Sequence, residues 1–203
     1  LVYVFIVIFP FLGAFSAYAM IVSLVPFTSQ SPFGNWAEPY QDFCEEASVV
    51  MVAHWVWNVP LSPAIADREM KIIKQFETLA FQRSKDNSAE DVATILKTLY
   101  GIKNVLTKEV MNKQELVVEL KQGKIIIVPA AGRMLKNPYF TPPGPFYHML
   151  VVRGHDPITN EFIVNDPGTK RGNGLRYHAT VLFNAMHDLN NGDVMNGKKM
   201  MIV

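Results

Sequence analysis

The chain has 203 residues, of which 49% are hydrophobic, and this suits one domain with a sizeable core and an appended segment. Its 19 basic and 18 acidic residues nearly balance, and no block of lysine or arginine occurs, so the composition argues against nucleic-acid binding. The only cysteine, Cys44, cannot form a disulfide within the chain, so it serves either packing or chemistry.

The start of the chain is apolar and carries no charge before Glu38. Residues 1–12 are almost wholly apolar, and Ala17-Tyr-Ala19 matches the small-x-small pattern that precedes a signal-peptidase cut. Roughly twenty apolar residues are also enough to span a bilayer. We therefore expect residues 1–24 to be a signal peptide or membrane anchor. Residues 25–203 would then form a domain outside the cytoplasmic membrane, either secreted or anchored.

The next segment predicts a loop followed by a buried helix. Residues 25–36 are rich in Pro, Gly, Ser and Asn, which is typical of an extended loop. A helix is expected from Cys44 to about Trp57, and it is apolar on every face after Glu45 and Glu46. At a helix start, free N–H groups and the dipole favour a thiolate, although the two glutamates oppose it. Cys44 is thus a candidate nucleophile, and a small buried hydrophobe is the alternative.

Further helices and then strands follow. Helix starts are indicated by three capping patterns, namely Ser62 before Pro63, Ser88 with Asp91, and Asn112 with Glu115. The later part has strand-type composition in residues 125–130, 147–152, 161–165 and 199–203. Because helices precede strands rather than alternating with them, the order predicts an α+β fold.

A nucleophilic cysteine needs a base and a third group that orients the base. His54 would lie about 15 Å along the helix from Cys44, so we expect it to be a satisfied core histidine. A cluster of turn formers centred on Pro157 predicts an antiparallel hairpin. That centre would place His148 and Asp166 directly opposite each other on one face of the sheet. The pair could orient a catalytic imidazole, or it could be a buried hydrogen bond without catalysis.

The same hairpin also contains possible metal ligands. His148, His155, Asp156 and Asp166 are all suitable residue types. However, His148 and His155 are separated by an odd number of residues, so they would point to opposite faces of a continuous strand. We therefore expect no metal and no other cofactor.

Three sequence blocks carry a resemblance to a known family. They are 25–30 with Trp36 and Gln41, then Cys44-Glu-Glu-Ala-Ser48, and finally residues 144–156 with 162–168. In this order they resemble the C39-like branch of papain-like cysteine peptidases, which is similar to the leader-peptide-cutting domains of bacteriocin exporters.

The resemblance implies a papain-like α+β fold, in which a central N-terminal helix packs on an antiparallel sheet. It implies Cys44, His148 and Asp166 as the catalytic triad. It also implies an upstream glutamine that donates to the oxyanion, for which we expect Gln41, with Gln30 as the alternative. The implied reaction is hydrolysis of a peptide bond through an acyl-enzyme, without a cofactor.

The sequence therefore predicts an exported or membrane-anchored cysteine peptidase, a monomeric domain that acts on a peptide or protein. Two alternatives stay open. One is a cell-wall peptide or amide hydrolase with the same triad, and the other is an inactive papain-like domain that binds peptides at the envelope. No ATP-binding or transport motif is recognisable in the sequence, so an exporter would be a separate partner.

Overall fold

The structure is a computed structural model, and it describes residues 19–82 and 85–203. Residues 1–18 of the expected leader lie outside the described residues. Strand β1 (Ile21–Val22) pairs with His155 and Gly154, so the sheet includes residues before the expected domain start at residue 25. Within the described part of the chain, no helix is both long and apolar enough to cross a membrane.

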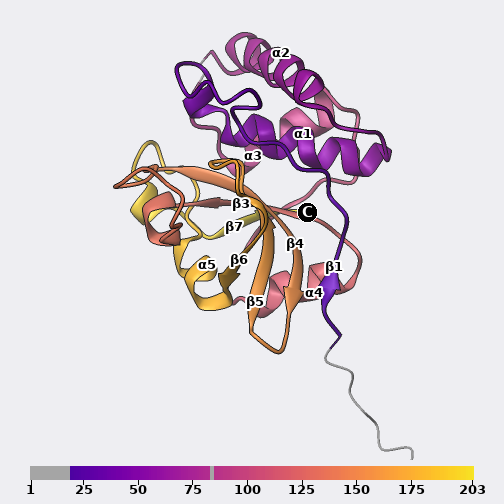
Figure 1. The fold of residues 1–203 in the computed structure, drawn as a ribbon, viewed down its shortest axis with the longest axis vertical. Helices are drawn as coiled ribbons and strands as arrows, with labels where there is room; N and C mark the ends of the chain where they lie inside the picture. Colours follow the sequence, from indigo (N-terminus) through magenta and orange to yellow (C-terminus); the bar gives the residue numbers. More distant parts are fainter. Residues whose placement is uncertain (1–18, 83–84) are drawn as a thin grey trace, which may run out of the picture.

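One layer of the molecule consists of helices α1 (Cys44–Trp57), α2 (Pro63–Phe81) and α3 (Ala89–Thr98). The starts of α2 and α3 are confirmed where capping patterns predicted them. The Ser62 hydroxyl accepts a hydrogen bond from the first turn of α2, and a complete capping box holds Ser88 at the start of α3. Figure 1 shows these helices stacked on one side of the sheet.

The second layer is one antiparallel sheet, as predicted, with strand order β2-β7-β3-β4-β5-β6 and β1 beside β4. Its strands are β2 (Thr107–Glu109), β3 (Ile126–Ala130), β4 (His148–Asp156), β5 (Glu161–Asn165), β6 (Asn173–His178) and β7 (Met200–Ile202). The remaining helices, α4 (Gln114–Lys121) and α5 (Ala179–Ala185), lie on the far face of the sheet from α1 (Figure 1).

Strand β4 is buried on both faces, and this explains why its sequence is a continuous apolar run. Met149 and Val151 belong to the core that includes α1, whereas Leu150 and Val152 belong to the core that includes α4 and α5. Successive side chains of a strand point to opposite faces, so a strand between two helical layers needs apolar residues at every position. The α+β class and the central helix packed on the sheet are thereby confirmed.

Strand β1 was not predicted because it falls in the apolar segment expected to be a leader, and β2 and β6 were not predicted because neither carries an apolar run. In β6 only Tyr177 is buried, and β1 and β2 are two and three residues long. Helix α4 begins at Gln114 with Lys113 as its N-cap, one residue after the expected cap Asn112, whose side-chain oxygen accepts from the Gln114 N–H. Tertiary pairing rather than local pattern places these short elements.

The hairpin of β4 and β5 is confirmed, but its turn lies later than predicted. Asp156 pairs with Glu161, so the turn comprises residues 157–160 and begins at Pro157 instead of being centred on it. A bulge at Arg153 also shifts the register between the two strands.

Consequently His148 and Asp166 are not directly opposite, and that prediction is wrong. Val151 pairs with Asn165, so the next pair along the ladder would join Leu150 to Asp166, two residues from His148. Because a shift of two residues keeps a side chain on the same face, the two remain diagonal neighbours. His148 and Asp166 are therefore neighbours even though the predicted position of the turn was wrong.

Candidate active site

Cys44 is the first residue of α1, where the helix meets the sheet. The residue is buried, and its thiol donates a hydrogen bond to Glu45 Oε2 over 2.9 Å. The other carboxylate oxygen, Glu45 Oε1, accepts from the backbone N–H of Asn87 at 3.0 Å. The backbone of Met149, in β4, also hydrogen-bonds the sulfur, which places the thiol next to the strand that carries His148.

These surroundings favour the neutral thiol. Burial raises the pKa of Cys44 well above its usual range, and the charge and hydrogen bond of Glu45 raise it further. Glu46 acts in the same direction through its charge, while the backbone hydrogen bond of Met149 opposes them. The helix start alone would favour a thiolate, so the two glutamates, together with burial, outweigh it.

His148 and Asp166 form a fully buried pair. The distance from His148 Nε2 to Asp166 Oδ1 is 2.8 Å, and both residues are at most 1% exposed. Asp166 Oδ2 accepts from the Tyr177 hydroxyl at 2.7 Å and from Asn137 Nδ2 at 2.9 Å. Burial raises the pKa of Asp166, but the imidazole and the donated hydrogen bonds outweigh burial and hold the pKa below its usual value.

Gly168 lets the chain pass close to this pair. Its N–H donates to Asp166 Oδ1 at 3.0 Å, which closes a turn after the aspartate. A Cβ at Gly168 would lie 2.9 Å from His148 Cε1 and 2.7 Å from Phe140 Cε1, so any larger residue would collide with both rings. Phe140 packs edge-on against the imidazole with 5.3 Å between ring centroids. With Nε2 engaged by Asp166, Nδ1 is the nitrogen left to exchange a proton with the cleft.

The structure brings all the predicted site residues except Asp166 to the wall of one cleft of about 610 Å³. The cleft separates the start of α1 from the start of β4, and Asp166 stands behind His148. In this structure the thiol's hydrogen bond runs to Glu45 rather than to His148. The residues that line the cleft include Gln30, Trp36, Gln41, Cys44, Thr141, His148 and Gly168.

The two candidate glutamines differ in what their amides do. Gln30 is buried, and its Nε2 donates to the carbonyl oxygens of Tyr40 and Gln41, over 2.9 and 2.7 Å. Gln41 is exposed, and its Nε2 donates to Glu38 Oε1 at 2.7 Å. Since an amide nitrogen carries two hydrogens, Gln30 has both engaged, whereas Gln41 keeps one for a ligand.

Sequence reasoning missed Asn137, Tyr177 and Gly168. The Asp-Pro-Gly run signalled a turn after Asp166, but nothing in the sequence indicated that Asn137 and Tyr177 would donate to that carboxylate. The interpretation of His54 as a satisfied core histidine is confirmed, because its ring contacts the Pro60 carbonyl at 3.0 Å and Glu69 at 3.2 Å.

A cluster of buried carboxyl groups lies near Cys44. Glu45, Glu46 and Glu77 are all buried, and Glu77 Oε1 accepts from Asn87 Nδ2 at 2.8 Å. Burial together with the charge of Glu45 raises the pKa of Glu77 to about 7. Burial and the charges of Glu77 and Glu45 raise the pKa of Glu46 well above its usual range. Glu46 and Glu77 therefore hold their protons to a higher pH than a free carboxyl group does.

The fold and this arrangement define a papain-like α+β protein. The family model described as Peptidase_C39 like matches residues 22–189, and the chain belongs to that family. A crystal structure from Bacillus anthracis, of a protein assigned to the C39-like peptidases, is similar in fold. It shares 14% identity with a TM-score of 0.59, and the match covers 91% of this chain and 98% of that one. No curated protein matches the sequence. Family membership supports a function of the cysteine-peptidase type.

Replacing Glu45 by Gln is expected to make the thiol more reactive. The substitution removes a charge and a charge-assisted hydrogen bond worth roughly 1.5–3 kcal/mol, so the pKa of Cys44 falls and the fraction of thiolate rises. A thiolate of lower pKa is less nucleophilic, which offsets about half of that gain. Iodoacetamide should therefore alkylate Glu45→Gln about 3- to 10-fold faster than wild type at pH 7. Glu46→Gln, which acts on the thiol through charge alone, should give a smaller increase. An unchanged or slower rate in Glu45→Gln would contradict the role assigned to Glu45.

Replacing Glu77 by Gln is expected to stabilise the protein at alkaline pH. The native state holds the Glu77 proton up to about pH 7, and the unfolded state releases it near pH 4.5, so this group's contribution to stability falls as pH rises between these values. At about 1.4 kcal/mol per unit, the variant should gain about 2–3 kcal/mol at pH 8 and little at pH 4.5 in urea unfolding.

The matched control is Glu119→Gln. Hydrogen bonds from Lys108 and Lys124 lower the pKa of Glu119, so this substitution should destabilise the protein at pH 8. If both variants shift the urea midpoint in the same direction at pH 8, the buried-carboxyl interpretation is wrong.

Proposed function

We propose that this protein is a cysteine peptidase that hydrolyses peptide bonds with Cys44 as nucleophile, His148 as base and Asp166 as the group that orients the base. One observation carries the proposal. The buried imidazole of His148 lies 2.8 Å from the buried carboxylate of Asp166, and His148 lines the same cleft as Cys44, the only cysteine of the chain.

The reaction begins with transfer of the thiol proton. The Cys44 thiol must first break its hydrogen bond to Glu45 and turn toward His148, which requires rotation of the short Cys44 side chain. Nδ1 of His148 then accepts the thiol proton. Asp166 stabilises the imidazolium through Nε2 and fixes its orientation. The thiolate attacks the peptide carbonyl, the carbon–nitrogen bond breaks, and His148 returns the proton to the leaving amine. Water, deprotonated by His148, then hydrolyses the thioester and releases the acid.

The oxyanion is held, in this proposal, by the backbone N–H of Cys44 and by Gln41. N–H groups in the first turn of a helix have no partner within the helix, so that of Cys44 is suited to a developing negative charge. Gln41 supports the same role because it lines the cleft and keeps one amide hydrogen uncommitted. Gln30 would instead stabilise the turn that precedes the nucleophile.

One observation favours a second candidate, a peptide-binding domain without turnover. The thiol is neutral and hydrogen-bonded to Glu45, which is the reverse of an ion pair between thiolate and imidazolium. If the sulfur never leaves Glu45, the cleft binds peptides but does not cleave them.

Variants of the three proposed catalytic residues separate these candidates. Cys44→Ala should abolish cleavage of a fluorogenic peptide library, and His148→Ala should lower kcat by about 10³-fold or more. Asp166→Asn should lower kcat by about 10²–10⁴-fold, with the fold checked by circular dichroism. His178→Ala, at an exposed histidine outside the cleft, should retain activity. Peptide binding that is unaffected by Cys44→Ala, with no cleavage by wild type, would identify the binding domain.

The same assay assigns the oxyanion donor. Gln41→Ala should lower kcat by about 10²-fold while the affinity for peptides changes little. Gln30→Ala should act mainly on stability, which its urea midpoint reports. A loss of kcat in Gln30→Ala at unchanged stability, with Gln41→Ala fully active, would transfer the role to Gln30.

We also propose that the domain acts outside the cytoplasmic membrane. The apolar residues 1–12 and the Ala17-Tyr-Ala19 pattern support export. A cut after Ala19 would leave β1 complete. The natural protein, fractionated from its own cells and sequenced from its N-terminus, should begin at Met20 in the envelope or medium, or keep its apolar segment in the membrane fraction. Recovery from the cytoplasm alone would contradict export.

A further inference from the structure

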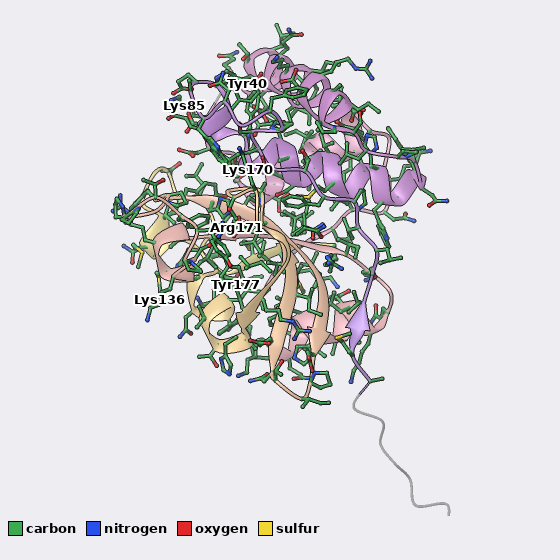
Figure 2. The ribbon with its side chains drawn as sticks, in the orientation of Figure 1. Tyr40, Lys85, Lys136, Lys170, Arg171 and Tyr177 are labelled. Atoms are coloured by element: carbon green, nitrogen blue, oxygen red, sulfur yellow. The ribbon has the colours of Figure 1, made fainter. Side chains whose placement is uncertain are left out.

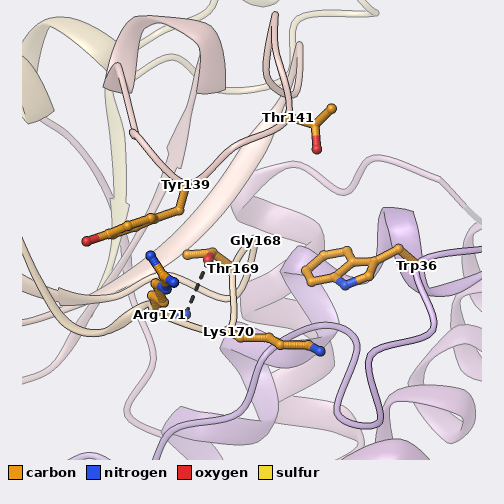
Figure 3. Close-up of a pocket in the computed structure, with 7 residues that line it drawn as sticks. All are labelled: Trp36, Tyr139, Thr141, Gly168, Thr169, Lys170 and Arg171. Carbon is orange, nitrogen blue, oxygen red and sulfur yellow. Dashed lines mark hydrogen bonds between the residues drawn. The ribbon is translucent and has the colours of Figure 1, made fainter.

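The cleft that holds Cys44 and His148 continues into a second cavity of about 380 Å³. The two cavities share Trp36, Thr141 and Gly168 in their walls, so they form one continuous groove. Figure 3 shows the second cavity, with Trp36 on one side and Tyr139 on the other. Its floor is the segment from Gly168 to Arg171, which directly follows the aspartate that orients His148.

Two cations stand in this cavity, Lys170 and Arg171 (Figures 2 and 3). The guanidinium of Arg171 lies 5.0 Å from the centre of the Tyr139 ring. Lys170 extends toward the N-terminal loop, where its Nζ would lie 2.7 Å from a Cβ built on Gly34. Within the described residues neither cation forms an ion pair, whereas Lys71, Lys85 and Arg176 all do. The positive charge is therefore left free at the end of the groove.

The backbone that presents these cations is held firmly. The Arg171 N–H donates to the hydroxyl of Thr169, which is itself buried, over 3.2 Å (Figure 3). The Asp166 N–H donates to the Gly172 carbonyl at 3.0 Å, and the Gln30 N–H donates to the Pro167 carbonyl at 2.9 Å. The position of the backbone that carries the cations, relative to His148, is thus fixed by the fold, as a binding subsite requires.

The position of the cavity tells which part of a substrate would reach it. His148 must protonate the leaving amine, so the residues that follow the cleaved bond lie on the imidazole side of the groove. Gly168 stands on that side, because its added Cβ would lie 2.9 Å from His148 Cε1. The chain that departs with the amine would therefore pass Gly168 and enter the cavity that contains the two cations.

We propose that Lys170 and Arg171 form a subsite for an anionic group on the leaving side of the substrate. The anion is a carboxylate, either an Asp or Glu side chain or the C-terminal carboxylate of a short leaving peptide. Arg171 provides a planar fork that suits a carboxylate, and Lys170 provides a second charge. This proposal rests on the proposed peptidase function, because it uses that function's assignment of the leaving side.

The test compares peptides that differ only in this charge. One pair carries Asp or Asn two residues after the cleaved bond, and a second pair ends there in a free carboxylate or an amide. Wild type should favour the anionic member of one or both pairs by about 5- to 30-fold in kcat/KM, mainly through KM, and less at 0.5 M salt. The pair with the larger ratio identifies the source of the carboxylate.

Charge variants then assign the preference to residues. Arg171→Gln and Lys170→Gln should each reduce the ratio, the double variant should bring it close to one, and Arg171→Lys should restore part of it. Lys136→Gln is the matched control, because it removes an equal charge outside this cavity and should leave the ratio unchanged (Figure 2). A ratio near one in wild type, or a full ratio in the double variant, would overturn the proposal.

Peptide binding to the Cys44→Ala variant tests the subsite separately from the peptidase function. Calorimetry with the same peptide pairs and Cys44→Ala should give a lower Kd for the anionic member. This preference should disappear when Lys170→Gln and Arg171→Gln are added to Cys44→Ala. If this preference appears while wild type cleaves nothing, the subsite stands and the peptidase function fails. Cleavage by wild type at equal rates for both members overturns the subsite alone.

Discussion

The buried carboxylate of Asp166 is the contact on which the site depends. It receives hydrogen bonds from His148 at the start of β4, Tyr177 in β6, Asn137 in the loop between β3 and β4, and the N–H of Gly168 in its own turn. An ionised carboxylate without exposure to water is tolerable only when its oxygens are fully engaged. The same four donors that keep Asp166 charged therefore also fix the imidazole and the turn that leads into the cation-bearing cavity.

The electrostatic surroundings of the Cys44 thiol have the opposite effect, because they oppose ionisation. Cys44 and Glu45 are consecutive residues of a buried helix start, and the carboxylate keeps the proton on sulfur. An imidazole held by a carboxylate on the sheet thus shares the cleft with a thiol held neutral on the helix. In the proposed mechanism, the proton moves only after the sulfur turns from Glu45 toward His148. The groove between the two layers is where a peptide would bring about that exchange.

Local patterns predicted those parts of the fold that bury apolar surface or cap a helix. The buried helix from Cys44 and the capping box at Ser88 are encoded within a few residues, so both appear where expected. The hairpin was predicted from its turn residues, but the bulge at Arg153 left no signature, and the register moved. His148 and Asp166 stayed together because strands repeat every two residues.

The sequence by itself determined the α+β order, the helix that begins at Cys44, and a histidine and an aspartate on one face of a hairpin. Only the tertiary structure decided the protonation of the thiol, the donors to Asp166 and the continuity of the two cavities. These properties depend on residues far apart in the chain, such as Asn137 and Tyr177, whose types carry no local signal. They also depend on burial, which alters the pKa of a carboxyl or thiol by amounts that no short-range pattern records.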